Sequence, residues 1–357
     1  MTPKCVFLTG GAGFVGSNLG IALKRAMPGL RVVAFDNLKR RGAELNLPRL
    51  AAHGVEFVHG DVRQREDLDC GVDADLLIEC SAEPSVLAGI GSSPDYVIQT
   101  NLVGTLNVLE YCRRRGTALI FLSTSRVYPI EPLCRIRLEE AATRFEIAAV
   151  QELPGVSARG VSEAFPLAGA RSLYGASKLA AELFVEEYAA QYRLTALIDR
   201  CGVIAGPWQM GKVDQGVVAL WVACHVFGRG LRYIGYGGHG KQVRDVLHVD
   251  DLCDLVRTQI AQLQTLRGQL FNVGGGRDVS LSLVELTALC REVTGRTVPI
   301  EAVPETRPAD VPLYLSDCTK LRGAVGWTPS RDVRRLVADV HAWVRDHAAV
   351  LEAIIGR

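Results

Sequence analysis

The sequence predicts an α/β fold, in which a doubly wound parallel sheet is followed by a smaller C-terminal lobe. Two observations support this prediction. Short apolar segments alternate with amphipathic helical segments through the first 200 residues, and the first apolar segment runs into a glycine-rich turn. With 357 residues, 48% of them hydrophobic, the chain is long enough for one large α/β domain or a two-lobed body.

The first strand is expected at residues 5–8, where "CVFL" precedes "TGGAGFVGSNLGIALKR". Gly10, Gly13 and Gly16 are spaced as G-x-x-G-x-x-G between this strand and a helical pattern. Such a turn needs residues without a Cβ, both for its own conformation and for close approach to a pyrophosphate. The helix that follows, beginning near Phe14 and Val15, adds its dipole and free N–H groups. The pattern therefore predicts a dinucleotide-binding turn.

An acidic residue ends the next expected strand, "RVVAFDN", about 20 residues after the turn. Asp36, with Asn37 beside it, is placed to accept the hydroxyls of an adenine ribose, and its charge would repel a 2′-phosphate. This favours NAD over NADP, although the basic "KRR" at residues 39–41 favours NADP. The alternative interpretation of Asp36 is a simple turn residue.

Further strands are expected at residues 55–61, 75–82 and 118–125, with a helical stretch at residues 94–115. In parallel sheets of this kind, ligands bind at the carboxyl ends of the strands. The polar or small residues at these ends are candidates for contact with the cofactor (Asp61, Val62, Ser81 and Ala82) or with the substrate (Glu83, Ser125 and Arg126), with Ser123 and Thr124 beside them.

Tyr174 and Lys178 lie four residues apart at the expected start of a helix, in "RSLYGASKLAAEL". Residues i and i+4 share one face of a helix, so both side chains can reach the same point. Alone, this spacing could equally be an exposed lysine beside a half-buried tyrosine.

Together, the glycine turn, the hydroxyl cluster at residues 123–125 and the Tyr174/Lys178 pair resemble the extended short-chain dehydrogenase/reductase family, along most of the chain. The resemblance implies a Rossmann domain, bound NAD and a sugar-nucleotide substrate. It also implies that Tyr174 is the acid/base, that Lys178 holds the nicotinamide ribose and lowers the tyrosine pKa, and that Thr124 hydrogen-bonds the reacting hydroxyl.

The second half of the chain extends this resemblance. "GKQVRDVLHVDDL" is similar to the family's R-D-x-x-H-V-x-D segment, which implies that Arg244 binds the substrate diphosphate, and Arg307 in "RPADV" is similar to a second diphosphate arginine. Each could instead form a surface ion pair. We expect His248 and Asp250–Asp251 to organise the loop and cap the next helix.

One departure from the family weakens the expected diphosphate site. "RCGVIAGP" has Val203 where the family often has asparagine, so one side-chain contact to the substrate is lost. Arg200 and Cys201 are expected near the pocket, and Gln215 is a further candidate for substrate contact.

The residues after Thr124 distinguish the reactions of this family. Sugar-nucleotide 4,6-dehydratases carry Asp-Glu there and UDP-glucuronate decarboxylases carry Glu, whereas this chain has Ser125-Arg126. Of the reactions compared, this leaves epimerisation.

The stretches "FDNLKRRGAELNL", "FVHGDVR", "VDQG" and "GKQVRDVLH" most resemble CDP-tyvelose (CDP-paratose) 2-epimerases, which implies inversion at C2 of a CDP-hexose by transient oxidation and re-reduction. The alternatives are a UDP-hexose 4-epimerase and, more remotely, a non-catalytic NAD(P)H sensor, although sensors typically lack the Tyr/Lys pair.

The domain boundaries follow from these assignments. Residues 1–200 plus 240–269 are expected to form the NAD-binding domain, and residues 201–239 plus 270–357 the nucleotide-sugar lobe, with the site in the cleft between them. The segment at residues 130–170 is longer than the family usually has, and we expect a partly ordered flap near the sugar. The helices at residues 94–115 and 174–192 resemble those that pair in the family's homodimers.

Charge and cysteine content limit the remaining possibilities. The formal net charge is +1 and both signs are interspersed, which favours a small-molecule substrate over nucleic acid or an anionic membrane. The ten cysteines lack a C-x-x-C pair or a Cys/His cluster, so we expect reduced thiols in a cytoplasmic protein and no metal site. No stretch resembles a signal peptide or a membrane span.

Overall fold

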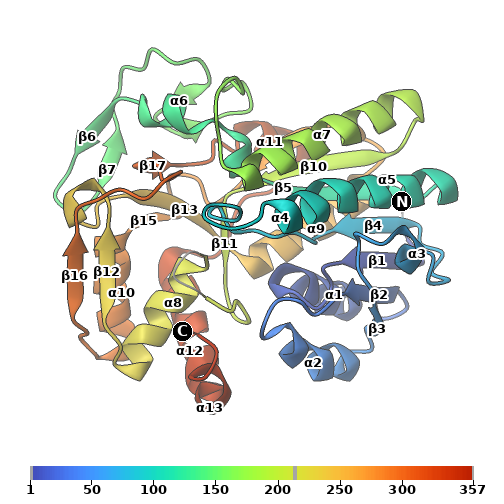
Figure 1. Cartoon of the computed structure of the whole chain (residues 1–357), viewed down its shortest axis with the longest axis horizontal. Coiled ribbons are helices and arrows are strands. Elements are labelled where there is room, and N and C mark those ends of the chain that lie inside the picture. Colours follow the sequence, from blue (N-terminus) through green and yellow to red (C-terminus); the bar gives the residue numbers. More distant parts are fainter. Residues whose placement is uncertain (1–2, 212–214, 356–357) are drawn as a thin grey trace.

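The computed structural model describes residues 3–211 and 215–355. Within them, the chain forms a parallel seven-stranded sheet with helices on both faces and a smaller lobe beside it (Figure 1). The strands of the large sheet lie in the order β14-β10-β5-β4-β1-β2-β3. Their bounds are β1 Cys5–Thr9, β2 Arg31–Asp36, β3 Glu56–His59, β4 Leu76–Glu79, β5 Ala118–Thr124, β10 Ala196–Cys201 and β14 Leu270–Val273.

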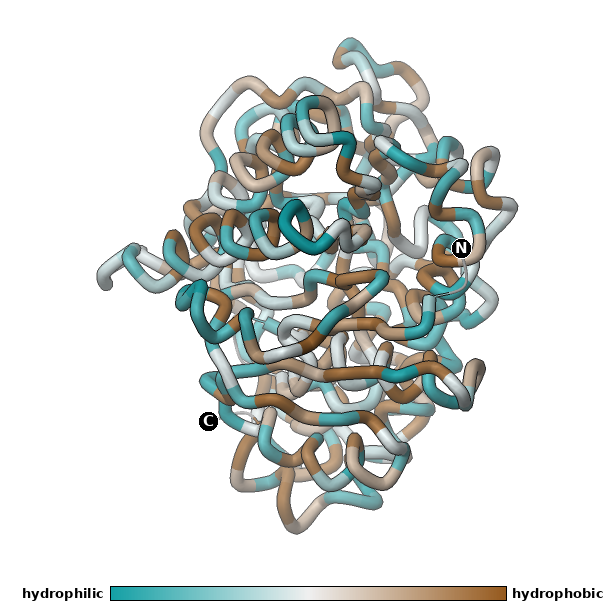
Figure 2. Tube along the Cα trace, turned by 90° about the vertical axis from the view of Figure 1, so that its right-hand side faces the viewer, coloured by the Kyte–Doolittle hydropathy of each residue, from teal (hydrophilic) through white to brown (hydrophobic). Residues whose placement is uncertain are grey.

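Each face of the large sheet has its own buried core because side chains alternate along every strand. One face packs against α3, α5 and α7, and the other against α1, α9 and α11. In Figure 2 the helices alternate between hydrophobic and hydrophilic residues along their length, as expected for elements with one buried side. The helices of this half are α1 Phe14–Ala26, α2 Asn46–Ala52, α3 Arg65–Leu68, α4 Asp95–Ile98, α5 Gly104–Arg115, α7 Leu173–Gln191, α9 Val249–Gln262 and α11 Thr319–Val325.

The helical stretch predicted at residues 94–115 is confirmed, but it is not uniform. A π-helical segment, Gln99–Val103, joins α4 to α5. Its Asn101 is fully buried and receives and donates hydrogen bonds across to the loop at Glu83 (2.8 and 3.1 Å). The segment therefore fixes the loop that follows β4.

The smaller lobe contains a four-stranded sheet in which β13 is bonded to β11, β15 and β17. A second core lies between this sheet and the helices α8, α10 and α12. The elements of the lobe are β11 Val203–Ala205, α8 Val217–Phe227, β12 Leu231–Ile234, β13 Val243–His248, β15 Ser280–Ser282, α10 Leu283–Thr294, β16 Ile300–Val303, β17 Leu313–Tyr314, α12 Val333–Asp346 and α13 Ala348–Leu351.

The observed strand pairing assigns two strands, β13 and β14, to the other part of the protein than the predicted domain boundaries did. β13, expected in the NAD-binding domain, pairs only within the small sheet among the described residues, whereas β14, expected in the lobe, forms the edge of the large sheet beside β10. α9 returns to the large sheet as predicted, packing on α1. An apolar strand can complete either sheet, so sequence pattern alone does not distinguish the two partners.

The segment at residues 130–170 has regular structure in place of the partly ordered flap we expected. It contains α6 Ile130–Cys134 and two antiparallel hairpins, β6 Leu138–Glu140 with β7 Phe145–Ile147 and β8 Val156–Ser157 with β9 Gly160–Val161. Its apolar side chains share a buried core with residues 311–315. This packing holds the segment against the lobe.

Candidate active site

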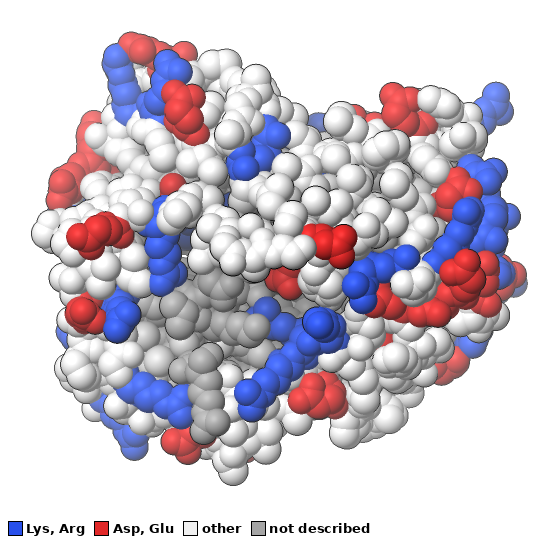
Figure 3. All heavy atoms as spheres, viewed as in Figure 1, with Lys and Arg blue, Asp and Glu red and all other residues white. Residues whose placement is uncertain are grey.

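A cavity of about 690 Å³ lies at the carboxyl edge of the large sheet and extends into the smaller lobe. At one end it is lined by the start of α1, the end of β5 and the first turns of α7. At the other end it is lined by β12, β13 and the loop before β17. Carboxyl ends of parallel strands are where α/β proteins bind ligands, so the cavity has the predicted location. Over the face shown in Figure 3, lysine, arginine and acidic side chains are interspersed rather than collected by sign.

The glycine-rich turn has no room for side chains. Gly10 has φ +62°, and a Cβ there would lie 2.8 Å from the backbone of Cys80. At Gly16 a Cβ would collide with the carbonyl oxygen of Gly10. Gly13 begins α1 without a side-chain cap, and the first turn holds no acidic residue. Close backbone approach and an uncapped helix N-terminus together fit the pyrophosphate of a dinucleotide, with Phe14 and Val15 lining the cavity beside it.

Asp36 ends β2 beside this turn. Its carboxylate accepts backbone N–H groups from Ala12 (3.1 Å) and Leu38 (2.8 Å), while burial raises its pKa. Asn37 donates to Asp61 (2.9 Å). Burial opposes ionisation of Asp61, but hydrogen bonds from Arg63 and Asn37 lower its pKa to about 2. The structure thus brings three predicted cofactor residues together at the ends of β2 and β3.

The remaining residues predicted near the cofactor differ in how they are placed. Ala82 lines the cavity, and Val62 is buried against Gly104 at the start of α5. The hydroxyl of Ser81 donates to the buried carboxylate of Glu79. Glu83, predicted to contact the substrate, instead caps its own loop by accepting the N–H of Ser85 (3.2 Å), and it is not among the residues that line the cavity.

Thr124, Tyr174 and Lys178 all line the cofactor end of the cavity. Thr124 ends β5 and accepts the N–H of Arg126 (3.2 Å), which fixes its hydroxyl at the strand end. Ser172 caps α7 so that Tyr174 lies in its first turn. Burial raises the pKa of Tyr174, and the largest opposing effects come from the side chain of Thr124 and the charge of Arg126. The hydroxyl groups of Thr124 and Tyr174 therefore face the same end of the cavity.

Lys178 is 2% exposed, and its Nζ lies 3.9 Å from the ring centre of Phe121. Burial lowers its pKa to about 8, against the opposing charges of Glu79 and Glu182. Ser123, which precedes Thr124, donates its hydroxyl to Glu182 beneath α7. Of the hydroxyl cluster predicted at this strand end, Ser123 is thus engaged by Glu182, whereas the Thr124 hydroxyl accepts only a backbone N–H among the hydrogen bonds of the described residues.

The far end of the cavity is rich in arginine. Arg244 is bonded to Asp310 (2.6 Å) and to the carbonyl oxygens of Val243 and Val311 (2.7 Å each). Arg126 donates to the carbonyl oxygen of Ala309 (3.1 Å), and burial, with the charge of Arg244, lowers its pKa to about 10. Arg307, Ser125 and Gln215 also line the cavity. Several guanidinium groups converging on one chamber suit an anionic ligand.

The strand β10 and the segment after it contribute unequally to the cavity. Cys201 and Val203 line it, but Arg200 does not: its guanidinium is bonded to Glu182 (2.7–3.1 Å) and Tyr128 (3.3 Å) inside the protein. Adjacent strand residues point to opposite faces, so only one of this pair can face the ligand. Part of the "VDQG" stretch, residues 213–214, lies outside the described residues.

Sequence reasoning missed the apolar wall of the substrate end. It is built by one side of α8, by the loop after β4 and by the ends of β12 and β15: Pro84, Val86, Leu87, Val217, Leu220, Trp221, Leu231, Leu281 and Leu283. The strongly apolar sequence of α8, "VVALWVACHVF", was the available signal, but burial against α10 and α12 explains most of it equally well.

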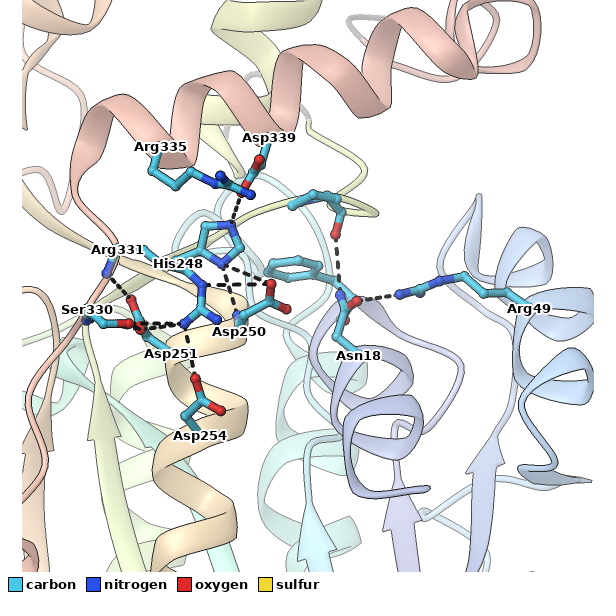
Figure 4. Close-up of polar contacts among 12 residues, drawn as sticks. Asn18, Arg49, His248, Asp250, Asp251, Asp254, Ser330, Arg331, Arg335 and Asp339 are labelled. Carbon is cyan, nitrogen blue, oxygen red and sulfur yellow. Dashed lines mark hydrogen bonds and ion pairs between the residues drawn. The ribbon is translucent and has the colours of Figure 1, made fainter. Parts of the chain in front are cut away.

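His248 and the acidic pair after it have the structural roles expected from the sequence (Figure 4). The imidazole accepts the N–H of Asp250 (3.0 Å) and so caps α9. Asp251 is buried and accepts hydrogen bonds from Ser330 and Arg331, which attaches α9 to the chain before α12. On the other side of this region, Arg49 donates to Asn18 of α1.

The family model for the NAD dependent epimerase/dehydratase family matches residues 6–274. The chain belongs to this family. It is 32% identical over 346 residues to CDP-paratose 2-epimerase of Salmonella typhi, covering 95% of this chain and 98% of that protein. It is 29% identical to UDP-glucose 4-epimerase of Yersinia pestis, covering 95% and 96%.

Solved structures agree with the assignment. UDP-glucose 4-epimerase of Thermus thermophilus, in complex with NAD, superposes with a TM-score of 0.76 at 26% identity, covering 96% of this chain and 99% of that one. The predicted family, the Rossmann fold, the NAD cofactor and the enzyme class are confirmed. In this family NAD supplies reversible oxidation of the sugar. No helix in the described part of the chain is long and apolar enough to cross a membrane.

Proposed function

We propose that this protein inverts C2 of a CDP-hexose of the paratose/tyvelose type, with transient oxidation and re-reduction at that carbon. The observation that carries the proposal is that Thr124 and Tyr174 line the same end of the cavity, and that Thr124 is followed directly by Ser125 and Arg126, which line it too. Members of the family that eliminate water carry Asp-Glu after the corresponding threonine, and members that decarboxylate carry a Glu, whereas this chain has neither acid there. The relative at 32% identity, a CDP-paratose 2-epimerase, supports the choice of carbon and nucleotide.

In this proposal, side chains of the protein transfer the proton of the sugar hydroxyl and bind both the cofactor and the nucleotide sugar. Tyr174 takes the proton of the reacting hydroxyl during oxidation and returns it after inversion, while Thr124 holds that hydroxyl oxygen. The phenol has an ordinary pKa near 10, so it needs positive charge nearby. Lys178 holds the nicotinamide ribose, and its ammonium, with Arg126, favours the phenolate.

Inversion requires the oxidised sugar to present its other face, so the nucleotide must stay bound while the sugar turns. Arg244, Arg126 and Arg307 at the far end of the cavity are suited to hold the diphosphate during this rotation. Asp310 already fixes the orientation of Arg244 before substrate binds.

The test is a panel of CDP-, UDP-, GDP- and dTDP-hexoses, first in thermal-shift binding and then in turnover analysed by NMR. We expect the CDP-hexose to give the largest stabilisation and a C2 epimer. Inversion of a UDP-hexose at C4 would instead support the 4-epimerase alternative. The similarity to the UDP-glucose 4-epimerase of Yersinia pestis is the observation that favours this alternative. Binding of NAD without change of any sugar would indicate a sensor.

We also propose that the protein is a homodimer. The outer surfaces of α4 and α7 expose large apolar side chains: Ile98 (37%), Leu183 (56%), Phe184 (42%) and Tyr192 (53%). Apolar groups gathered on neighbouring helices favour an interface over solvent. Light scattering should give twice the chain mass, and Phe184→Glu should give the monomer. A wild-type monomer at micromolar concentration would contradict the proposal.

A further inference from the structure

Glu79 is a buried carboxylate that the reaction described above does not use. It ends β4 and is 1% exposed. Its two oxygens accept the hydroxyls of Thr9 (2.8 Å) and Ser81. Burying a carboxylate is costly unless a cation or several donors offset its charge. Among the described residues, no lysine, arginine or histidine nitrogen lies within 4.0 Å of it.

Lys178 is a buried cation that, like the Glu79 carboxylate, lacks a close partner of opposite charge among the described residues. Its ammonium is buried over the ring of Phe121, and in the described part of the chain no carboxylate oxygen lies within 4.0 Å of it. The ring face offers only a weak attraction, which falls short of the cost of burying an ammonium. An opposite charge at slightly longer range is therefore needed.

Strand register places the two groups on one face of the large sheet. Glu79 is paired with Phe121 across β4 and β5, and with Thr9 across β4 and β1. Side chains opposite one another in register point to the same face. Since Lys178 lies over the ring of Phe121, Glu79 is the acid next to that ring on the same face.

Glu182, the other acid near Lys178, is already neutralised. It forms an ion pair with Arg200 (2.7 Å), and its remaining oxygen also accepts from Ser123. The other titratable groups around the two residues are Tyr174 and the thiols of Cys80, Cys112 and Cys201. Burial raises the pKa of each thiol above its ordinary value, so all three stay protonated near neutral pH.

We propose that Glu79 is a positioning residue for Lys178, whose carboxylate, held in place by Thr9 and Ser81, keeps the ammonium charged and directed at the nicotinamide ribose. The inference rests on the proposed contact between Lys178 and that ribose. Glu79 touches neither cofactor nor substrate and acts only through the lysine. Consistent with this, the Glu79 charge is the largest effect that opposes the lowering of the Lys178 pKa.

The test is the pH dependence of NAD affinity, measured by calorimetry between pH 6.5 and 9.5 without sugar nucleotide. We expect the wild type to lose affinity as Lys178 deprotonates, with a midpoint near pH 8 or above. Glu79→Gln, which keeps the shape of the side chain, should move that midpoint down by about 1 pH unit, because an opposite charge nearby shifts a pKa by about 1–3 units. At pH 8 this is roughly a several-fold weaker affinity than wild type.

Two variants make the result specific. Thr9→Val removes one of the two hydroxyl donors to Glu79 but leaves the carboxylate and its Ser81 partner, so its midpoint should shift by clearly less than that of Glu79→Gln. Lys178→Met should abolish the transition. If Glu79→Gln is recovered only as aggregate, Glu79→Asp, which withdraws the carboxylate by one methylene, should give a smaller shift in the same direction.

Three results would overturn the inference: an unchanged midpoint in Glu79→Gln, an equal shift in Thr9→Val, or a transition that persists in Lys178→Met. The last result would also count against the ribose contact itself. Failure of the sugar-nucleotide panel, in contrast, would refute the proposed reaction and leave the NAD titration unaffected. The two proposals can therefore fail separately.

Discussion

The two ends of the cavity are built differently. The cofactor end is formed by strand ends and helix starts of one parallel sheet, where Thr124, Tyr174 and Lys178 are fixed by a strand terminus, a capped helix and burial. The substrate end is assembled from β12, β13 and the loop that carries Asp310, with arginines held by backbone carbonyl groups. In the proposed function, the first end supplies the oxidation and the proton transfer, and the second binds the nucleotide sugar.

The largest effect should come from Tyr174→Phe, which removes the proton carrier at the cofactor end. We expect turnover to fall by at least about 10²–10⁴-fold, because acid/base groups typically contribute that much. NAD and sugar nucleotide should bind nearly as in the wild type, since little surface is lost. Steady-state rates with calorimetric binding check this, and activity within about tenfold of wild type would refute the role of Tyr174.

Arg244→Ala tests the opposite end. It removes a charge-assisted contact to the diphosphate of on the order of 2–3 kcal/mol, equivalent to a roughly 30- to 150-fold higher KM. NAD affinity should stay unchanged. Arg31→Ala, which breaks a half-exposed ion pair with Glu56, is the control for losing an arginine elsewhere. Loss of NAD binding with intact sugar-nucleotide affinity would mean that the two ends are reversed.

Arg126 is bonded to Ala309 at the far end of the cavity, but its charge also acts on Tyr174, so its replacement should affect both ends. Its charge lowers the pKa of Tyr174, so in Arg126→Ala that pKa rises. Since the phenolate is the proton acceptor, the acid limb of the kcat profile should move to higher pH by about 1 unit, accompanied by a several-fold rise in KM. A pH profile superimposable on wild type would limit Arg126 to substrate binding.

The smallest expected effect is an increase in substrate affinity, from replacing Val203. Val203 lines the substrate end, at the position where the resemblance described above implies asparagine. Val203→Asn should provide one hydrogen bond from a neutral amide to the charged diphosphate and so lower KM by roughly 10-fold or less. Val203→Thr, whose hydroxyl is too short to replace the amide, serves as its control. A higher KM in Val203→Asn would show that the valine packs against the ligand.

Sequence reasoning found the cofactor end more completely than the substrate end. Gly10, Asp36 and Tyr174 lie in short segments where spacing along one strand or helix determines what meets in space. Arg200 shows the limit of this reasoning. It precedes Cys201 in the chain, but its guanidinium forms hydrogen bonds with Glu182 of α7 and so points into the protein interior, away from the cavity. The wall formed by α8 has no local signature, because the same apolar residues serve a core and a pocket.

The sequence also could not predict which strands pair with one another. β13 and β14 have similar apolar character, yet one completes the small sheet and the other the large one. Likewise, the segment at residues 130–170 packs on residues 311–315, far away in the chain. Such pairings depend on the folded arrangement as a whole.

The central claim, inversion by oxidation and re-reduction at C2, is tested most directly by turnover of a CDP-hexose in D₂O with the NAD-loaded protein. Internal return of the hydrogen predicts a C2 epimer without deuterium at C2. The rival route, deprotonation of carbon by a cavity group such as Cys201, would introduce solvent deuterium at that carbon. Substantial deuterium at C2, or normal turnover by protein shown to be free of NAD, would contradict the account.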